Sequence, residues 1–212
     1  MTVIKKIPVQ KHQNPDSKGR ILQTAVSLFA RHGFAETGMR ELAATAEVNL
    51  SMVNYFFGSK KGLLKEILDS FLSGYLIIAE KELAGAGTLH SKLERFIAGA
   101  VSYFDAERDS LIITISELPH DDPEIVEHKA GWARQMVEIV NREVCLPHAA
   151  ETGQHIPPTC LAPLLTSLMA SRFLFAPLME KVEAGSSEAV KIEDYTKMIA
   201  GIFLQGITGR RL

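Results

Sequence analysis

The chain has 212 residues of ordinary globular composition, with 46% hydrophobic and 23% charged residues and a formal net charge of −2. This length allows one or two domains, and the small net charge argues against generic nucleic-acid binding. Two cysteines, Cys145 and Cys160, are too few for a disulfide framework or a cysteine-rich zinc site. No signal peptide and no apolar run of about eighteen residues is evident, so we expect a cytoplasmic protein without a membrane partner.

The first element is a helix that follows a basic segment. Residues 1–15 contain three lysines and two prolines and are predicted to form a mobile arm, which either touches DNA phosphates or is a solvated tail. Asn14 or Asp16 can cap the helix, and Gly33 is predicted to end it in a Schellman-type stop with Phe34 as the hydrophobic partner. Its apolar stripe consists of Ile21, Leu22, Ala25, Leu28 and Phe29.

Residues 33–64 spell two short helices, a tight turn and the start of a third helix. The second short helix is predicted to bury Val53 and Phe57 at i and i+4, and the side chain of Asn49 can cap it. This arrangement predicts a helix-turn-helix whose second helix enters a DNA major groove. The outward residues of that helix are Leu50, Ser51, Asn54 and Tyr55.

This stretch contains, in order, the motifs GF, T, REL-A, A-x-V-N, NYFF, GSK and LL. With these motifs in this order, it resembles the N-terminal domain of TetR-family transcriptional regulators. The resemblance is strongest over residues 16–64. Gly38 stands where a Thr N-cap is usual, although Glu41 keeps the capping-box position. Glu47 replaces the usual turn Gly, and a positive φ there would carry about 1 kcal/mol of strain. Phe56 replaces a frequent His.

The charge distribution agrees with a DNA-binding N-terminus. Residues 1–64 contain nine Lys and Arg against four Asp and Glu, whereas residues 65–212 contain fourteen against twenty-one. A basic N-terminal third and an acidic remainder are expected when only one end of the chain meets phosphate.

Ser59 is predicted to cap a long helix that runs to about Leu83. It should pack on the DNA-binding unit at its start and on the C-terminal core further along, which makes it a candidate lever or a plain connecting helix. Residues 91–106 resume helical periodicity after a glycine-rich break. Residues 111–118 could pass for a buried strand, but the chain offers no partner strand, so we predict a helix.

The motif HDDPE at residues 120–124 offers a metal site or, more simply, a helix N-terminus with Asp121 or Asp122 as the cap. The helix it opens should run to about Cys145. His128 and Trp132 lie one turn apart on it and either face a ligand or join the core. A further cluster could suggest a metal ion or a cysteine nucleophile but lacks ligand spacing and an orienting third group. It comprises Cys145, His148 and His155.

Two very apolar helices complete the chain. Thr159 is predicted to cap the first, which Pro177 should kink or end near Ala176, and the second starts at about Glu193. We expect Leu164 to Phe173 and Ile199 to Phe203 to form a homodimer seam, or alternatively to close the core.

The patterns together predict an all-α protein. Residues 1–15 form the arm, 16–60 a three-helix DNA-binding domain with a helix-turn-helix, and 61–212 a helical ligand-binding and dimerisation domain. The resemblance implies a dimeric repressor that leaves a near-palindromic double-stranded DNA operator when a small molecule binds. The alternatives are a helix-turn-helix used for protein contacts, or a small helical ligand-binding protein or enzyme using the C-terminal cavity. No catalytic motif, metal site or cofactor is predicted.

The resemblance also implies roles for individual residues. Arg40 should read a base edge, Leu50, Ser51 and Asn54 should face bases, and the phosphate contacts should come from Thr37, Tyr55 and Lys60. These roles suit the chemistry, because Arg pairs bidentately with guanine and Asn with adenine.

Arg172 lies in the apolar run MASRFLFAP, where a guanidinium needs an anionic partner. The partner is either structural, such as Glu117 or a group across the dimer seam, or the carboxylate or phosphate of an elongated apolar effector. The walls of such a site would be Tyr103, Trp132, Met136, Phe173 and Phe175.

Overall fold

The structure is a computed structural model that describes residues 15–115, 122–182 and 190–208. Across these ranges all regular elements are helical and none is a strand, which confirms the all-α prediction. The basic arm up to residue 14, the capping candidate Asn14, Asp121 and Glu117 lie outside the described residues.

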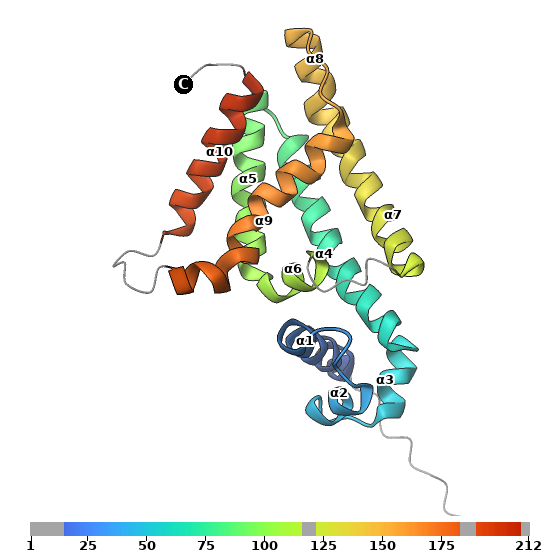
Figure 1. Cartoon of the computed structure of the whole chain (residues 1–212). Coiled ribbons are helices and arrows are strands. Elements are labelled where there is room, and N and C mark those ends of the chain that lie inside the picture. Colours follow the sequence, from blue (N-terminus) through green and yellow to red (C-terminus); the bar gives the residue numbers. More distant parts are fainter. Residues whose placement is uncertain (1–14, 116–121, 183–189, 209–212) are drawn as a thin grey trace, which may run out of the picture.

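The N-terminal unit consists of α1 (Pro15–His32), α2 (Met39–Thr45) and α3 (Leu50–Phe57), which lie together at one end of the molecule (Figure 1). Gly33 ends α1 with φ 83°, and its N–H donates to the Phe29 carbonyl at 2.9 Å. This single bond is the αL motif rather than the full Schellman motif, and Phe34 packs edge-on to Phe29 as expected. The core of this unit includes Ile21, Ala25, Leu42, Val53 and Phe57.

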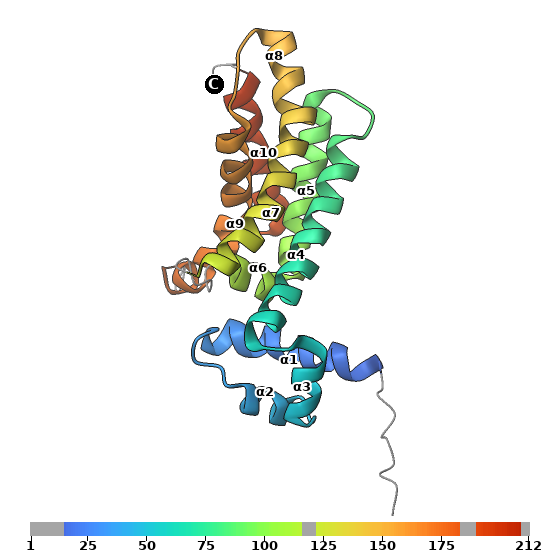
Figure 2. The same cartoon turned by 90° about the vertical axis from the view of Figure 1, so that its right-hand side faces the viewer.

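Helix α4 (Lys60–Leu83) is common to both parts of the molecule, and Figure 2 shows it rising from α3 along the C-terminal helices. Its predicted bounds are confirmed, with the Ser59 hydroxyl accepting from the Gly62 N–H at 3.0 Å. Leu63, Leu64 and Ile67 are buried in the N-terminal cluster, whereas Phe71 and Tyr75 belong to the larger C-terminal cluster. One rigid helix therefore contributes to two hydrophobic cores.

The C-terminal helices are α5 (Leu89–Ala106), α6 (Arg108–Ile115), α7 (Pro123–Val140), α8 (Leu146–Thr152), α9 (Pro158–Val182) and α10 (Ile192–Thr208). The helical prediction for the apolar run after residue 110 is confirmed as far as Ile115. Helices α4, α5, α7, α9 and α10 surround the larger cluster, in which Phe96 and Phe104 are fully buried (Figures 1 and 2).

The helix after Asp122 is longer than predicted. A π-helical turn over Asn141–Cys145 joins α7 to α8, so the chain stays helical until Gly153, which has φ 74°. Pro147 does not interrupt it, because proline is tolerated in the first turn of a new helical segment, where its missing N–H is not needed.

One expectation for α9 is wrong, and of the two alternatives for Pro177 the structure shows the kink. Pro158 is the first helical residue, and the Pro157 carbonyl accepts from the N–H groups of Cys160 and Leu161, so Thr159 lies inside the first turn and does not cap it. Pro177 does not end the helix, which continues to Val182 and changes direction in its C-terminal part (Figure 1). Proline removes one backbone bond and kinks a helix, and neighbouring turns keep theirs.

Helix α9 is also the one described helix that is long and apolar enough to cross a membrane by length and composition, with a mean hydropathy of 1.4. The core helix of a soluble protein passes the same test, so this helix alone does not indicate a membrane span. Only 33% of that window is buried, because one side packs into the core and the other carries exposed Leu164, Phe175 and Leu178. The helix therefore has an apolar side that its own chain does not cover.

Two glycines provide a matched test of the packing between α4 and α5. A Cβ at Gly74 in α4 would overlap the Tyr103 hydroxyl and lie 2.7 Å from its Cζ, whereas nothing lies within 4 Å of a Cβ at Gly131 in α7. We expect Gly74→Ala to lower the free energy of unfolding by about 1–3 kcal/mol through overpacking. Gly131→Ala should raise it by about 0.5–1 kcal/mol through helix propensity. Chemical denaturation measures both, and equal effects would contradict the close α4–α5 approach.

Candidate nucleic-acid interface

Helix α2 begins without a side-chain cap. Gly38 has extended backbone (φ −86°, ψ 143°), and its N–H donates to Glu41 Oε2 at 3.4 Å. Because glycine has no side chain, this is half of a capping box, and the predicted role of Glu41 is confirmed. Leu42 and Ala43 on the inner side are buried, which fixes the rotation of α2 about its axis.

The turn between α2 and α3 is tight and strained. Glu47 has φ 54°, and the Val48 N–H closes the turn on the Ala43 carbonyl at 2.9 Å. Glu47 therefore has the positive φ that its Cβ disfavours by about 1–2 kcal/mol. The turn is kept because Val48 and the two flanking helices pack on the N-terminal core.

Helix α3 starts at Asn49 by a backbone contact alone. The Asn49 carbonyl accepts from the Met52 N–H at 2.9 Å, but its side chain makes no capping hydrogen bond, so the side-chain part of that prediction is wrong. Val53 and Phe57 are buried as predicted, and Gly58 with φ 71° ends the helix. The Asn49 amide thus stays at the exposed start of α3.

The predicted base-reading side chains lie on the surface of these two helices. Arg40, Ser51 and Asn54 are exposed, and Leu50 is half-buried. Arg40 makes no hydrogen bond or ion pair with any residue that the structure describes. Tyr55 is 67% exposed and packs edge-on to Phe56. Helices α2 and α3 lie at the end of the molecule away from the C-terminal helices, so a duplex can approach them (Figures 1 and 2).

The structure gives Thr37 a different role from the predicted phosphate contact. Its side chain is 2% exposed, and its hydroxyl donates to the carbonyls of Gly33 at 2.9 Å and Leu28 at 3.4 Å. A hydroxyl directed inward cannot hold a phosphate without breaking these bonds. Thr37 instead fixes the loop that leads from α1 to α2.

Lys60 also supports this loop. Its Nζ donates to the Ala35 carbonyl at 2.9 Å and lies 4.6 Å from the centre of the Phe34 ring. Partial burial lowers the pKa of Lys60, and the nearby Glu36 carboxylate opposes that shift. An ammonium group has three N–H donors, so the group can bind a phosphate while keeping the loop contact.

Polar contacts between α4 and the start of α7 were not predicted. Asp69 Oδ1 accepts from Trp132 Nε1 at 2.7 Å and from His128 Nε2 at 2.6 Å. One and two turns earlier on α4, Lys65 pairs with Glu124 at 2.7 Å and Lys61 with Asp122 at 2.6 Å. The ion pair with Lys61 lowers the pKa of Asp122 and raises that of Lys61. We call this set the α4–α7 polar ladder.

A signal for the ladder was present in the sequence. Lys61, Lys65 and Asp69 follow one another at four-residue intervals, and so do Glu124, His128 and Trp132. Such spacing puts each triplet on one face of its helix. The capping role predicted for Asp122 is confirmed, since its carboxylate accepts from the N–H groups of Glu124 and Ile125.

The residues predicted to line an effector site are only partly brought together. Tyr103, Trp132, Met136 and Phe173 lie in or against the larger core, where Tyr103 and Phe173 both contact Phe104. Burial raises the pKa of Tyr103 to about 12, and its hydroxyl donates to the Phe71 carbonyl of α4 at 3.0 Å.

Phe175 and Arg172 are placed differently from the prediction. Phe175 is 56% exposed and does not belong to an interior wall. Arg172 donates to the Val190 carbonyl at 2.6 Å and stacks on Tyr195 with 5.6 Å between the guanidinium carbon and the ring centre. Among the described residues, the half-buried Arg172 guanidinium therefore contacts a carbonyl and a ring and pairs with no carboxylate.

The cysteines do not form a reactive site in the part of the chain described. Cys145 is buried, which raises the pKa of its thiol and disfavours the nucleophilic thiolate, whereas Cys160 is exposed on α9. His148 is 3% exposed, and its Nε2 has no partner among the described residues, while His155 is exposed.

Comparison with known proteins agrees with this geometry. A family model described as "Bacterial regulatory proteins, tetR family" matches residues 21–67, which span α1 to the first part of α4. The probable HTH-type transcriptional regulator YttP of Bacillus subtilis is 39% identical over 59 residues, which cover 28% of each protein. The HTH-type transcriptional repressor SCO4008 of Streptomyces coelicolor is 24% identical over 181 residues, covering 82% of this chain and 86% of that protein.

The fold has solved counterparts over nearly its whole length. The crystal structure of the transcriptional regulator FadR from Bacillus subtilis, in complex with stearoyl-CoA, superposes with a TM-score of 0.71. It covers 92% of this chain and 100% of that chain at 14% sequence identity. At 14% sequence identity, this similarity is evidence for the fold alone.

The strain at Glu47 can be measured. Glu47→Gly should be more stable than Glu47→Ala by about 1 kcal/mol, because both variants lose the carboxylate but only glycine adopts φ 54° without a clashing Cβ. Urea denaturation of the two variants isolates the backbone term from the charge. An alanine variant as stable as the glycine variant would contradict a strained turn.

Proposed function

Because the chain belongs to the TetR family of transcriptional regulators, we propose that it is a homodimeric repressor that leaves its operator when a small molecule binds. The observation that carries the proposal is the exposed helix-turn-helix attached to one end of α4, a helix that is also part of the C-terminal core. Members of this family are transcriptional regulators and not enzymes. We propose that this protein acts in the cytoplasm, where DNA is accessible.

Arg40 on α2 and Asn54 on α3 are assigned to bases. Arg40 is exposed and unpaired among the described residues, so binding a guanine edge breaks no existing contact. Ser51 and Leu50 at the start of α3 face neighbouring bases, and Tyr55 and Lys60 hold phosphates. Phosphate contacts set position and base contacts set sequence preference.

The dimer is proposed to form through α9 and α10. Leu164 on α9 and Met198 and Ile202 on α10 are each more than half exposed, although both helices bury their opposite sides. Uncovered apolar area of this kind marks an association surface. A two-fold axis through this seam presents two copies of α3, so the operator is a near-palindrome with half-sites about one helical turn or slightly more apart.

The effector is proposed to act through contacts that the C-terminal domain makes with α4. Trp132 and Tyr103, both assigned to the effector site, donate hydrogen bonds to Asp69 and to the Phe71 carbonyl of this helix. A ligand that competes for these donors favours another position of α4 and so changes the separation of the two DNA-binding units. The proposed effector is elongated, apolar and anionic, a class that includes the stearoyl-CoA bound by the FadR structure.

Selection of bound fragments from genomic DNA, followed by variants, tests the DNA-binding assignment. Arg40→Ala and Asn54→Ala should relax the preference at particular base pairs by about 1–3 kcal/mol. Lys60→Ala should weaken binding to all sequences alike and flatten its salt dependence. Arg134→Ala, which removes an exposed arginine on α7, serves as the control and should change neither the sequence preference nor the salt dependence of binding.

The result that overturns these roles is a Lys60→Ala variant with altered sequence preference beside an Arg40→Ala variant with none. Failure to enrich any sequence would contradict operator binding itself.

The dimer seam is tested by charge insertion. Ile202→Glu should shift the protein to monomer in sedimentation, because burying an unpaired carboxylate in the seam costs several kcal/mol. Ile202 is 56% exposed within one chain, so the monomer should still fold. Ile77→Glu, at a site on α4 that is 66% exposed, is the matched control and should remain dimeric. A dimeric Ile202→Glu variant would remove this residue from the interface.

A further inference from the structure

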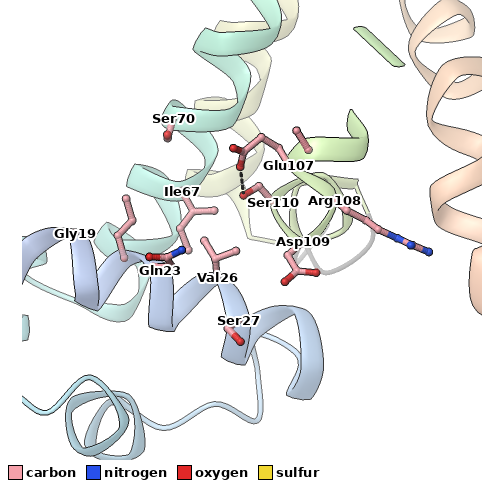
Figure 3. Close-up of a pocket in the computed structure, with 12 residues that line it drawn as sticks. Gly19, Gln23, Val26, Ser27, Ile67, Ser70, Glu107, Arg108, Asp109 and Ser110 are labelled. Carbon is pink, nitrogen blue, oxygen red and sulfur yellow. Dashed lines mark hydrogen bonds between the residues drawn. The ribbon is translucent and has the colours of Figure 1, made fainter. Parts of the chain in front are cut away.

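A cleft lies where the DNA-binding unit meets the C-terminal domain. Helix α1, the middle of α4 and the start of α6 enclose about 640 Å³, a volume within the range of small-molecule sites (Figure 3). Leu22 and Val26 of α1 and Ile67 of α4 supply its apolar lining. It shares no residue with the six side chains assigned above to the effector site.

The polar rim of this cleft is predominantly acidic. Glu107 and Asp109 both line it, and Figure 3 shows the Arg108 side chain extending away from the other labelled side chains. The hydroxyl of Ser110, which is 7% exposed, donates to Glu107 Oε2 at 3.4 Å and so orients this carboxylate. Asp109 makes no hydrogen bond or ion pair with a described residue.

The charged residues that line the cleft are Glu107, Asp109 and Arg108, so their summed formal charge is negative. Lys18, beside the lining residue Gly19, is paired with Glu66 at 2.7 Å and is therefore already neutralised. Ser27 and Gln23 add uncharged hydrogen-bonding groups from α1. The cleft thus combines an apolar lining, two carboxylates, neutral polar groups and one guanidinium, that of Arg108, whose side chain extends away from the others.

We propose that this cleft binds a small organic cation, an amine with an apolar body, as a second regulatory site distinct from the C-terminal effector site. An ammonium group suits the two carboxylates, which accept charge-assisted hydrogen bonds, and the body fits between Leu22, Val26 and Ile67. The binding part of this proposal is independent of the proposed function.

The position of the cleft gives the ligand a route to DNA binding. Ile113 of α6 is fully buried in the same cluster as the α1 residues Ile21 and Ala25, so α6 is the part of the C-terminal domain on which α1 rests. A molecule wedged between α1 and α6 favours one spacing of the two helices over others. Its binding energy is thereby coupled to the orientation of the DNA-binding unit.

Calorimetry with three probes of matched shape tests the site. 4-Phenylbutylamine should bind at least tenfold more tightly than 4-phenylbutan-1-ol, and 4-phenylbutyrate should bind most weakly, because only the amine complements Glu107 and Asp109. The preference for the amine should decrease with ionic strength, since the rim is exposed. Equal binding of the three probes would overturn the assignment.

Charge-removing variants locate the site. Glu107→Gln and Asp109→Asn should each weaken binding of 4-phenylbutylamine by about tenfold. Asp105→Asn removes an exposed carboxylate close in sequence that does not line the cleft, and should leave binding unchanged. Amide chemical-shift changes should concentrate in α1 and α6. An equal loss in Asp105→Asn, or shifts confined to other helices, would place the amine elsewhere.

The regulatory part is tested with the selected operator and rests on the proposed function. Saturating amine should change operator affinity at least twofold, and operator should change amine affinity by the same factor. If the amine binds without changing operator affinity, the proposed regulatory role is wrong, whereas the proposed binding site is not. Amine binding by a protein that selects no DNA would instead overturn the proposed function.

Discussion

The structure depends on the shared burial of α4. This helix places Leu63, Leu64 and Ile67 in the core of the DNA-binding unit and Phe71 and Tyr75 in the core of the C-terminal domain. Because the i→i−4 hydrogen bonds of a helix resist bending, the two cores are mechanically coupled where they share α4. The proposed effector would therefore act on the helix-turn-helix by displacing the upper half of α4.

Hydrogen bonds and ion pairs fix the relative position of neighbouring helices, which hydrophobic packing alone does not determine. The α4–α7 polar ladder supplies ion pairs and the two bonds to Asp69, and Tyr103 bonds the Phe71 carbonyl. Lys129 of α7 donates to the Thr114 carbonyl of α6, with burial lowering its pKa. Exposed ion pairs contribute little to stability, so their main effect is to select one register between helices that could otherwise slide.

The DNA-binding unit keeps its reading surface by local means. Half a capping box, a strained Glu47 and the inward hydroxyl of Thr37 set the loops, while Lys60 secures the first loop against α4. None of these contacts uses Arg40 or Asn54 side chains, which stay exposed on the surface. The residues that set the loops and the residues proposed to read DNA are thus separate sets, which would allow sequence preference to change without loss of the fold.

The sequence by itself determined the helices and most of their ends, because these follow from spacing and from neighbours within four residues. Ser59, Asp122, Gly33 and the burial of Val53 and Phe57 were all predictable on this basis. The tertiary structure decided which side chains contact one another and which are exposed. Asp69 and Trp132 pair although they are distant in the chain, and the exposure of Phe175 depends on which helices pack beside α9. Local periodicity carries no information on such contacts, since their energies arise only when helices pack.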